Sequence, residues 1–207
     1  GRMFISASIA PLFPSQYAHS RRISCDVDGT LGLTEYQLNN LTYGWWQNGT
    51  IYRYPDPDYM PLAKGETFEA ARTRVNAAAI SGTVYLNSDD VRNPTARQYM
   101  VELLKNPEIN EVALKGKAFR PLEGNTGTAA ADAFVLENKK GVYYMAVFNY
   151  TWESVEKTFD ARRVGLPPAT RYAVTDLWTN ENVTADGDAL TIVLEPAQSK
   201  LLRITVR

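Results

Sequence analysis

The residues best suited to chemistry gather in residues 20–27, directly after the single histidine, His19. Arg22 and Asp26 stand four positions apart in a short run with β-strand character. Side chains alternate across a strand with a period of two, so Arg22, Ser24 and Asp26 are expected to share one face. Opposite charges on one face either pair at the surface or serve a site, because burying them unpaired is costly. The run alone leaves both interpretations open.

The opposite face of the same run is apolar. Ile23, Cys25 and Val27 alternate with the polar positions, which predicts that Cys25 is a buried apolar filler. One cysteine and one histidine in the whole chain predict neither an internal disulfide nor a zinc site. We therefore expect no metal and no cofactor.

The amino-acid composition limits the classes of molecule that the chain is expected to bind. Of the 207 residues, 44% are hydrophobic and 22% are charged, which is ordinary for a globular protein with a packed core. The net charge of −1 gives no electrostatic footprint for nucleic acid or an anionic membrane. No apolar run approaches the roughly 20 residues that a membrane-spanning helix needs. The first residues lack the pattern of a secretory signal.

Aromatic side chains are dense in one region of the sequence. Aromatic rings fill cores, and their faces also stack on the apolar faces of sugars. Either use fits a cluster that comprises Tyr43, Trp45, Trp46, Tyr52, Tyr54 and Tyr59.

The first part of the chain alternates strand and helix patterns, which is typical of parallel βα units. The predicted strands are residues 3–10, 21–27, 50–54 and 80–86, and the first of them is a mostly apolar run, as in a strand buried on both faces. The predicted helices are residues 34–46, 66–79 and 94–105. Residues 106–120 have a mixed pattern that predicts no single element.

The character of the sequence changes in residues 123–131, which are rich in Gly, Thr and Ala. We place a domain boundary there, between residues 1–122 and residues 131–207. Residues 138–141 separate two apolar runs and predict a β-hairpin. The pattern predicts an antiparallel β domain of the sandwich type, with strands at residues 133–137, 142–149, 151–159, 172–177, 189–194 and 200–206.

Several short motifs occur in an order that resembles glycoside hydrolase families 27 and 36, which contain α-galactosidases and α-N-acetylgalactosaminidases. The motifs are Arg22-x-x-x-Asp26, Asp56-Pro57-Asp58-Tyr59-Met60, Ala79-Ile80-Ser81-Gly82, Ser88-Asp89-Asp90 and Thr175-Asp176-Leu177-Trp178-Thr179. The resemblance covers most of the chain. It implies a fold that is α/β plus all-β: the C-terminal half of a (β/α)₈ TIM barrel, strands five to eight, followed by an antiparallel β-sandwich.

The resemblance also implies roles for individual residues. Asp26 matches the general acid/base of these families, and Arg22 matches an arginine that hydrogen-bonds the sugar. Asp56 and Asp58 match residues that line the site, and we add Tyr59 and Trp46 as sugar-binding aromatics. A direct ion pair would disfavour the protonated carboxyl that a general acid needs. We therefore expect Arg22 to point at the sugar rather than at Asp26.

A retaining glycosidase needs a second carboxylate as nucleophile, about 5 Å from the acid/base. In these families the nucleophile lies in a Lys-x-Asp motif on the fourth barrel strand, and no such strand precedes residue 3. We therefore expect the chain to be the C-terminal portion of a glycosidase acting on terminal α-linked galactose-type sugars, and to be inactive alone.

Two further expectations follow from the resemblance. Open strand edges predict a homo-oligomer or association with a missing N-terminal half. The families favour a periplasmic or extracellular location. The alternative to an enzyme is a non-catalytic carbohydrate-binding or interaction protein that keeps half of the barrel and the β domain.

Overall fold

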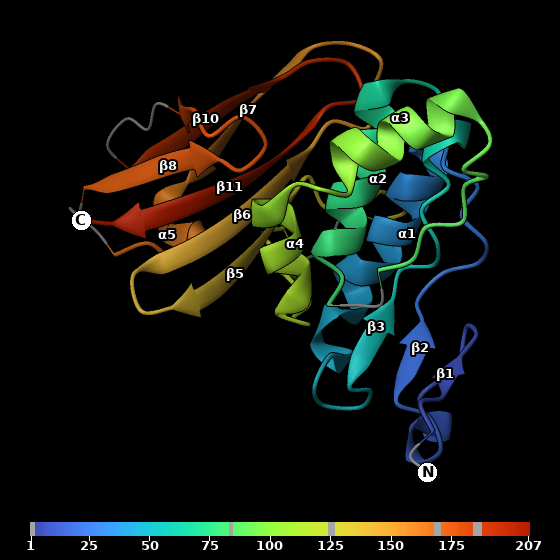
Figure 1. The fold of residues 1–207 in the computed structure, drawn as a ribbon. Helices are drawn as coiled ribbons and strands as arrows, with labels where there is room; N and C mark the ends of the chain where they lie inside the picture. The colour runs from blue at the N-terminus through green and yellow to red at the C-terminus, as the bar shows by residue number, and fades with distance from the viewer. Residues whose placement is uncertain (1–2, 83–84, 124–126, 168–170, 184–187) are drawn as a thin grey trace.

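The computed structural model describes residues 3–82, 85–123, 127–167, 171–183 and 188–207. Its elements form a helical layer with a small parallel sheet at one end, next to a β-sandwich that contains the C-terminus (Figure 1). The first described residues lie at the free tip of the parallel sheet, far from the sandwich (Figure 1).

The parallel sheet consists of β1 (Ser6–Ala7), β2 (Ser20–Arg22) and β3 (Tyr54–Asp56), in that order. These strands are shorter than the sequence predicts. The strand expected at residues 50–54 starts at Tyr54, because the carbonyl of Gln47 accepts the amides of Thr50, Ile51 and Tyr52 and holds that segment in a turn.

A fourth parallel strand was predicted at residues 80–86, of which 83 and 84 lie outside the described residues. The described remainder carries only one isolated bridge, from Ser81 to Ala118, and a second joins the following residue, Asn87, to Met60. Within the described ranges, the parallel sheet therefore has three strands.

The helices begin at capping residues that the sequence supplies. In α1 (Leu31–Gly44) and α2 (Phe68–Ala79), the hydroxyls of Thr30 and Thr67 accept an amide of the first turn. In α3 (Pro94–Leu103) and α4 (Pro107–Leu114), the side chain of an asparagine caps the start of the helix, and a proline follows it at the first helical position. The sequence did not predict α4, although its start repeats the Asn-Pro pair of α3. None of the described helices is long and apolar enough to cross a membrane.

Three single-turn helices link the main elements of the N-terminal part. They are η1 (Phe13–Gln16), η2 (Trp45–Gln47), which continues α1, and η3 (Leu62–Lys64), which follows β3. The carboxylate of Asp89 accepts the amides of Leu62 and Ala63 and caps η3.

The C-terminal part is a sandwich of two antiparallel sheets, as predicted. The larger sheet has the order β4 (Arg120–Pro121), β5 (Ala133–Lys139), β6 (Val142–Phe148), β11 (Ser199–Val206), β8 (Tyr172–Asp176) and β9 (Asn182–Val183). The smaller sheet pairs β7 (Val155–Asp160) with β10 (Ala189–Leu194), and α5 (Ala161–Val164) follows β7. The predicted hairpin is confirmed as the β5–β6 turn, where Gly141 has a φ of 79°.

The larger sheet is the middle layer of the molecule, buried on both faces. Along β6, Met145 and Val147 pack into the sandwich core, whereas Ala146 and Phe148 pack into the core shared with the helices. The nearly continuous apolar sequence of β6 follows from this position, because both faces of the strand are covered.

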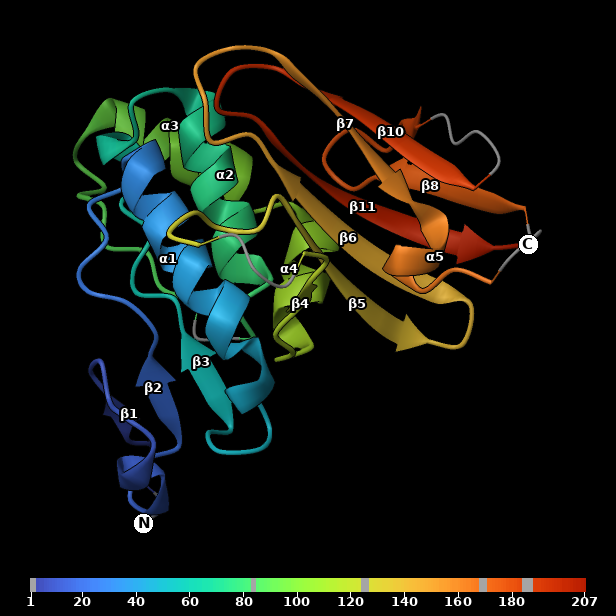
Figure 2. The ribbon, with the colours of Figure 1, turned by 180° about the vertical axis from the view of Figure 1, so that it is seen from behind.

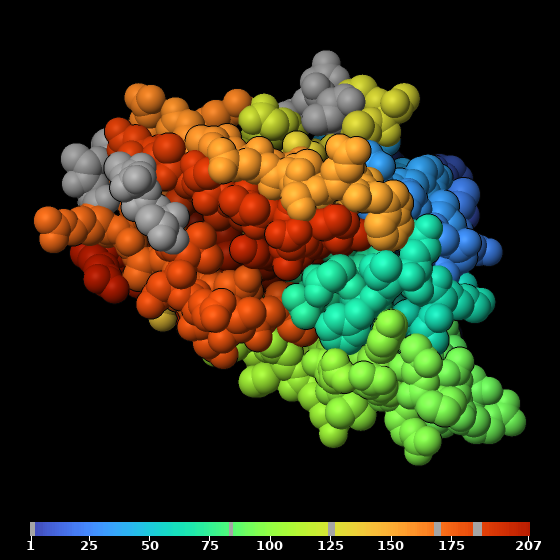
Figure 3. Space-filling model, turned by 90° about the horizontal axis from the view of Figure 1, so that it is seen from above, coloured from blue at the N-terminus to red at the C-terminus, as the bar shows by residue number. Residues whose placement is uncertain are grey.

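Polar side chains join α2 to the sandwich. Thr73 donates to the carbonyl of Ala197, Asn76 donates to the hydroxyl of Ser199 at 2.8 Å, and the indole of Trp178 donates to Asn76 at 2.9 Å. Figures 2 and 3 show the helices lying directly against the β strands. The two parts of the chain therefore share one continuous core.

We predict that Gly82→Ala destabilises the fold by about 2–4 kcal/mol. Gly82 has a φ of 85°, and a Cβ there would overlap the backbone nitrogen of Ala118 and lie 2.8 Å from the carbonyl carbon of Lys117. Urea unfolding followed by circular dichroism measures the change. Gly32→Ala is the control: apart from its chain neighbours and the backbone of its own helix, no atom lies within 4 Å of its Cβ position, and helix propensity favours alanine by no more than about 1 kcal/mol. Equal midpoints for the two variants would contradict the prediction.

Candidate active-site cleft

A polar cleft of about 610 Å³ opens where the three parallel strands end. Ligand sites of open parallel sheets form at this carboxyl edge, because the loops after the strands converge there. The cleft is lined by Ser6, Ser8, Arg22, Asp56, Asp58, Tyr59, Lys64, Leu86 and Ser88. Four of the residues that the sequence singled out are therefore brought together: Arg22, Asp56, Asp58 and Tyr59.

Asp56 and Asp58 are nearly buried, with exposed fractions of 9% and 7%. One oxygen of Asp56 accepts the amide of Asp58 at 2.8 Å, and the other accepts the hydroxyl of Ser6 at 3.2 Å. Asp58 accepts the amide of Val27 at 3.0 Å. Asp58 also has a φ of 69°, in the left-handed region that non-glycine residues rarely adopt. The two carboxylates are thus fixed in position by the backbone around them.

Arg22 links the cleft to Asp26, and this corrects the expectation for its direction. Its Nη2 lies 2.8 Å from Oδ1 of Asp26, and its Nη1 lies 3.4 Å from Oδ1 of Asp58. Arg22 therefore points at Asp26 and bridges two carboxylates. Asp26 itself is 82% exposed at its side chain and is not among the residues that line the cleft; only its ion pair with Arg22 connects it to the cleft.

The local backbone explains why Arg22, Ser24 and Asp26 do not share one face of a strand, as the sequence had predicted. β2 ends at Arg22, and the Nε of Arg22 donates to the carbonyl of Ser24 at 3.1 Å, closing a turn. Side-chain alternation stops where the strand stops. As a result Ser24 is buried, and Cys25 is exposed, which corrects the prediction that Cys25 fills the core.

Behind the cleft, the fully buried side chain of Arg74 on α2 holds the loop that carries Asp58. Its Nη2 donates to the carbonyls of Pro57, Asp58 and Tyr59, the last at 2.9 Å. Burial lowers the pKa of Arg74 to about 10, and the negative charges of Asp58 and Asp56 oppose that lowering. The guanidinium stays charged at neutral pH and satisfies carbonyls that would otherwise be buried without partners.

A second set of contacts orients Arg74. Its Nη1 donates to Gln37 of α1 at 3.1 Å, and Gln37 donates to the hydroxyl of Ser81 at 3.1 Å. Ser81 donates in turn to the carbonyl of Ala77. This buried chain ties both helices to the loop after β3, so the cleft is positioned by the helical layer.

Trp46 lies elsewhere. It belongs to η2, which leads into the N-terminal end of β3, and its indole donates to the carbonyl of Tyr43. Trp46 is 44% exposed and does not line the cleft, since the cleft opens at the other end of β3. The structure thus separates Trp46 from the other residues singled out.

The sequence analysis missed Ser6, Ser8 and Arg74. Ser6 and Ser8 stand two positions apart in a run interpreted as mostly apolar and buried on both faces, and this spacing was a signal for a polar face. Arg74 sits in a helix where arginine is common, so nothing in its own segment distinguished it. Within the described residues, no three of His, Cys, Asp or Glu gather in a way that could hold a metal ion.

Comparison with known proteins agrees with the motifs. Residues 128–204 match the family described as the alpha galactosidase C-terminal beta sandwich domain. A search of curated proteins found no match. The resemblance to glycoside hydrolase family 27 inferred from the sequence is confirmed by this match and by the solved structures that follow.

Three solved structures share the fold. A family 27 β-L-arabinopyranosidase from Geobacillus stearothermophilus, in complex with arabinose, has a TM-score of 0.76 at 19% identity over 98% of this chain and 50% of its own. α-Galactosidase I from Mortierella vinacea has a TM-score of 0.73 at 16% identity, over 93% of this chain and 54% of its own. A putative α-N-acetylgalactosaminidase from Bacillus halodurans has a TM-score of 0.69 at 19% identity, over 89% of this chain and 45% of its own. The chain spans about half the length of the structures it matches.

Proposed function

We propose that this chain is the C-terminal portion of a retaining glycosidase. The proposal starts from the premise that the chain has the fold of the C-terminal half of family 27 glycoside hydrolases. On this proposal residues 1–122 are half of a (β/α)₈ barrel, and residues 131–207 are the β-sandwich domain. The observation that carries the proposal is the polar cleft at the ends of β1, β2 and β3, where Arg22, Asp56 and Asp58 converge.

In the proposed mechanism, Asp26 protonates the leaving glycosidic oxygen while a carboxylate outside this chain attacks the anomeric carbon. Asp26 then takes a proton from water, and that water attacks the covalent glycosyl intermediate. The assignment of Asp26 is supported by its exposed carboxylate and its ion pair with Arg22, which lines the cleft, whereas Asp56 and Asp58 are tied to backbone amides. These two carboxylates form the wall that receives sugar hydroxyls.

Arg22 has a place in this mechanism despite its pairing with Asp26. An ion pair with one exposed partner contributes little free energy, typically below about 1 kcal/mol. A sugar hydroxyl that accepts from the guanidinium of Arg22 can therefore replace Asp26 at small cost. That exchange frees Asp26 to carry the proton.

The proposed substrates have a terminal α-linked sugar of the galactose type, bound with the help of Tyr59. The names of the structural relatives support this class: they include an α-galactosidase and a putative α-N-acetylgalactosaminidase, beside a β-L-arabinopyranosidase. Sugars of this class carry several hydroxyls, which suit the polar lining of the cleft.

A non-catalytic interaction protein is the second candidate, and exposed apolar side chains favour it. Met3 is 76% exposed, Phe13 76% and Tyr17 72%, all in the segment around β1, the outer strand of the parallel sheet. An exposed strand edge beside apolar side chains invites association with another chain. The same segment is where a homo-oligomer, or a complex with the other half of a barrel, would form.

We predict that the chain alone releases no nitrophenol from nitrophenyl α-galactoside, and that light scattering gives a mass above the 23.1 kDa of one chain. Supplying a polypeptide with the four other strands and their nucleophilic carboxylate should restore hydrolysis. A monomer with full activity would contradict the proposal, because the nucleophile would then lie within these 207 residues. A complemented chain that binds galactosides but never hydrolyses them would favour the interaction protein.

A further inference from the structure

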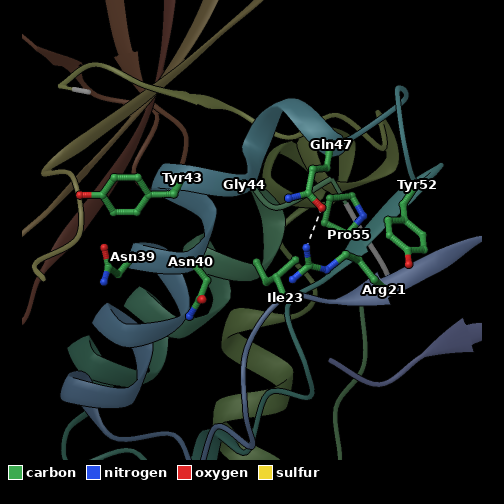
Figure 4. Close-up of a pocket in the computed structure, with 9 residues that line it drawn as sticks. All are labelled: Arg21, Ile23, Asn39, Asn40, Tyr43, Gly44, Gln47, Tyr52 and Pro55. Carbon is green, nitrogen blue, oxygen red and sulfur yellow. Dashed lines mark hydrogen bonds between the residues drawn. The ribbon is translucent and has the colours of Figure 1, made fainter. Parts of the chain in front are cut away.

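A second polar hollow, of about 270 Å³, adjoins the cleft. One of its walls is η3 with the residue before it, and the other consists of residues 88–90 and the start of α3. Lys64 and Ser88 line both the hollow and the cleft, so the two spaces are neighbours. The cavity of about 220 Å³ beside α1 differs, because it shares no lining residue with the cleft and its Arg21 donates to Gln47 (Figure 4).

One side chain fixes the two walls of the hollow to each other. The carboxylate of Asp89 accepts the amides of Leu62 and Ala63 in η3, at 2.8 and 3.0 Å, and the side-chain amide of Asn87 at 2.8 Å. Asn87 also donates to the carbonyl of Met60 at 2.8 Å. A surface that is already in place loses less conformational entropy when a ligand binds to it. The hollow is therefore preformed.

Three exposed residues of the hollow carry hydrogen-bond donors that the protein itself leaves open. Within the part of the chain that the structure describes, no ion pair or side-chain hydrogen bond engages the ammonium of Lys64 or the hydroxyl of Ser88. The side-chain oxygen of Asn93 caps α3 by accepting the amides of Thr95 and Ala96, which leaves its Nδ2 as a donor. An ammonium, a hydroxyl and an amide NH₂ all donate to the hydroxyls of a sugar.

The loop that carries Asp26 packs against the hollow. A Cβ on Gly29 would lie 2.7 Å from the carbonyl oxygen of Pro61, which lines the hollow, and 3.5 Å from the amide nitrogen of Gly65. In the proposed mechanism Asp26 protonates the leaving oxygen, so the leaving group lies next to this loop. A leaving group that extends from the cleft past Lys64 enters the hollow.

We propose that the hollow binds a sugar unit of the leaving group, so that the preferred substrates are oligosaccharides with a terminal α-linked galactose-type sugar. This inference rests on the proposed function and adds Lys64, Ser88 and Asn93 as residues that determine specificity. Lys64 and Ser88 lie between the two spaces and contact the chain of sugars where it passes from one to the other. A volume of about 270 Å³ is large enough for a sugar ring.

The test is NMR of the full chain, labelled with nitrogen-15, in titrations with two ligands. Methyl α-galactoside has no sugar in its leaving group, whereas raffinose has a terminal α-galactose followed by two further sugar units. The amides of Val27 and Asp58 report on the cleft, and those of Asn93 and Ala96 report on the hollow. We expect both ligands to shift the cleft amides and raffinose alone to shift the hollow amides, with a Kd at least about threefold lower than that of methyl α-galactoside.

The pattern of shifts separates this inference from the proposed function. Cleft amides that respond to both ligands, with hollow amides that respond to neither, would overturn the hollow as a sugar site and leave the proposed function standing. Hollow amides that respond to raffinose without any response in the cleft would support sugar binding in the hollow and overturn the role of the cleft. No shift with either ligand would overturn both.

Two variants and a control make the test specific. Lys64→Met keeps the length of the side chain without its ammonium, and Asn93→Asp keeps a good helix cap without the Nδ2 donor. Each should weaken raffinose binding by about three- to tenfold, the effect of one lost hydrogen bond. Lys117→Met removes an exposed lysine outside the cleft and the hollow and should bind raffinose as the wild type does. Equal raffinose affinity in all three variants would overturn the proposal.

Discussion

Asp26→Asn, made in the complete glycosidase that we propose, is expected to lower kcat for an unactivated α-galactoside by about 10²–10⁴-fold. Asparagine cannot donate a proton to the leaving oxygen or take one from water, yet it has nearly the same shape. A nitrophenyl substrate should lose less in the first chemical step, because nitrophenolate is a good leaving group that departs as the anion without protonation. The measurement is the kcat ratio of variant to wild type on both substrates.

Folding controls for this variant can be made on the chain itself. The side chain of Asp26 is 82% exposed and its ion pair is with Arg22, so Asp26→Asn should leave the thermal midpoint nearly unchanged. Asp28→Asn, on the same loop and also exposed, is the matched control for activity and should keep the wild-type kcat. A normal rate for Asp26→Asn on the unactivated galactoside would remove Asp26 from the acid/base role.

The second large effect concerns Arg74. Arg74→Met is expected to lower the free energy of unfolding by about 3–5 kcal/mol, because buried carbonyls of the loop lose their donor. Pro57 and Tyr59 accept from Arg74 through their carbonyls, and Gln37 accepts through its side chain. Methionine fills similar space but donates nothing. Urea unfolding measures the loss.

Arg97→Met on α3 provides the comparison, because Arg97 is exposed and its replacement should change stability by less than about 0.5 kcal/mol. A local readout separates positioning of the cleft from general destabilisation. The amides of Asp58 and Val27 both donate to carboxylates of the cleft, so hydrogen exchange should accelerate there first. Unchanged exchange at these two amides would mean that Arg74 stabilises the core without positioning the cleft.

Local sequence patterns predicted much of the fold. The turn at residues 138–141, the strand β6 and the helices α1, α2 and α3 follow from turn chemistry, periodicity and capping, which act over a few residues. Of the residues that the motifs singled out, Arg22, Asp56, Asp58 and Tyr59 occur at or just beyond strand ends and line the cleft, whereas Asp26 and Trp46 do not line it.

Contacts between distant segments decided the rest. β2 ends at Arg22 rather than at residue 27, and the side chain of Asp58, which is 31 residues away from Val27 in sequence, accepts the amide of Val27. No pattern within residues 20–27 encodes that bond, so alternation wrongly buried Cys25. In the same way, Arg74 acquires its partners only when α1, α2 and the loop after β3 pack together. A buried guanidinium needs several acceptors at once, and only the tertiary structure brings acceptors from separate segments within its reach.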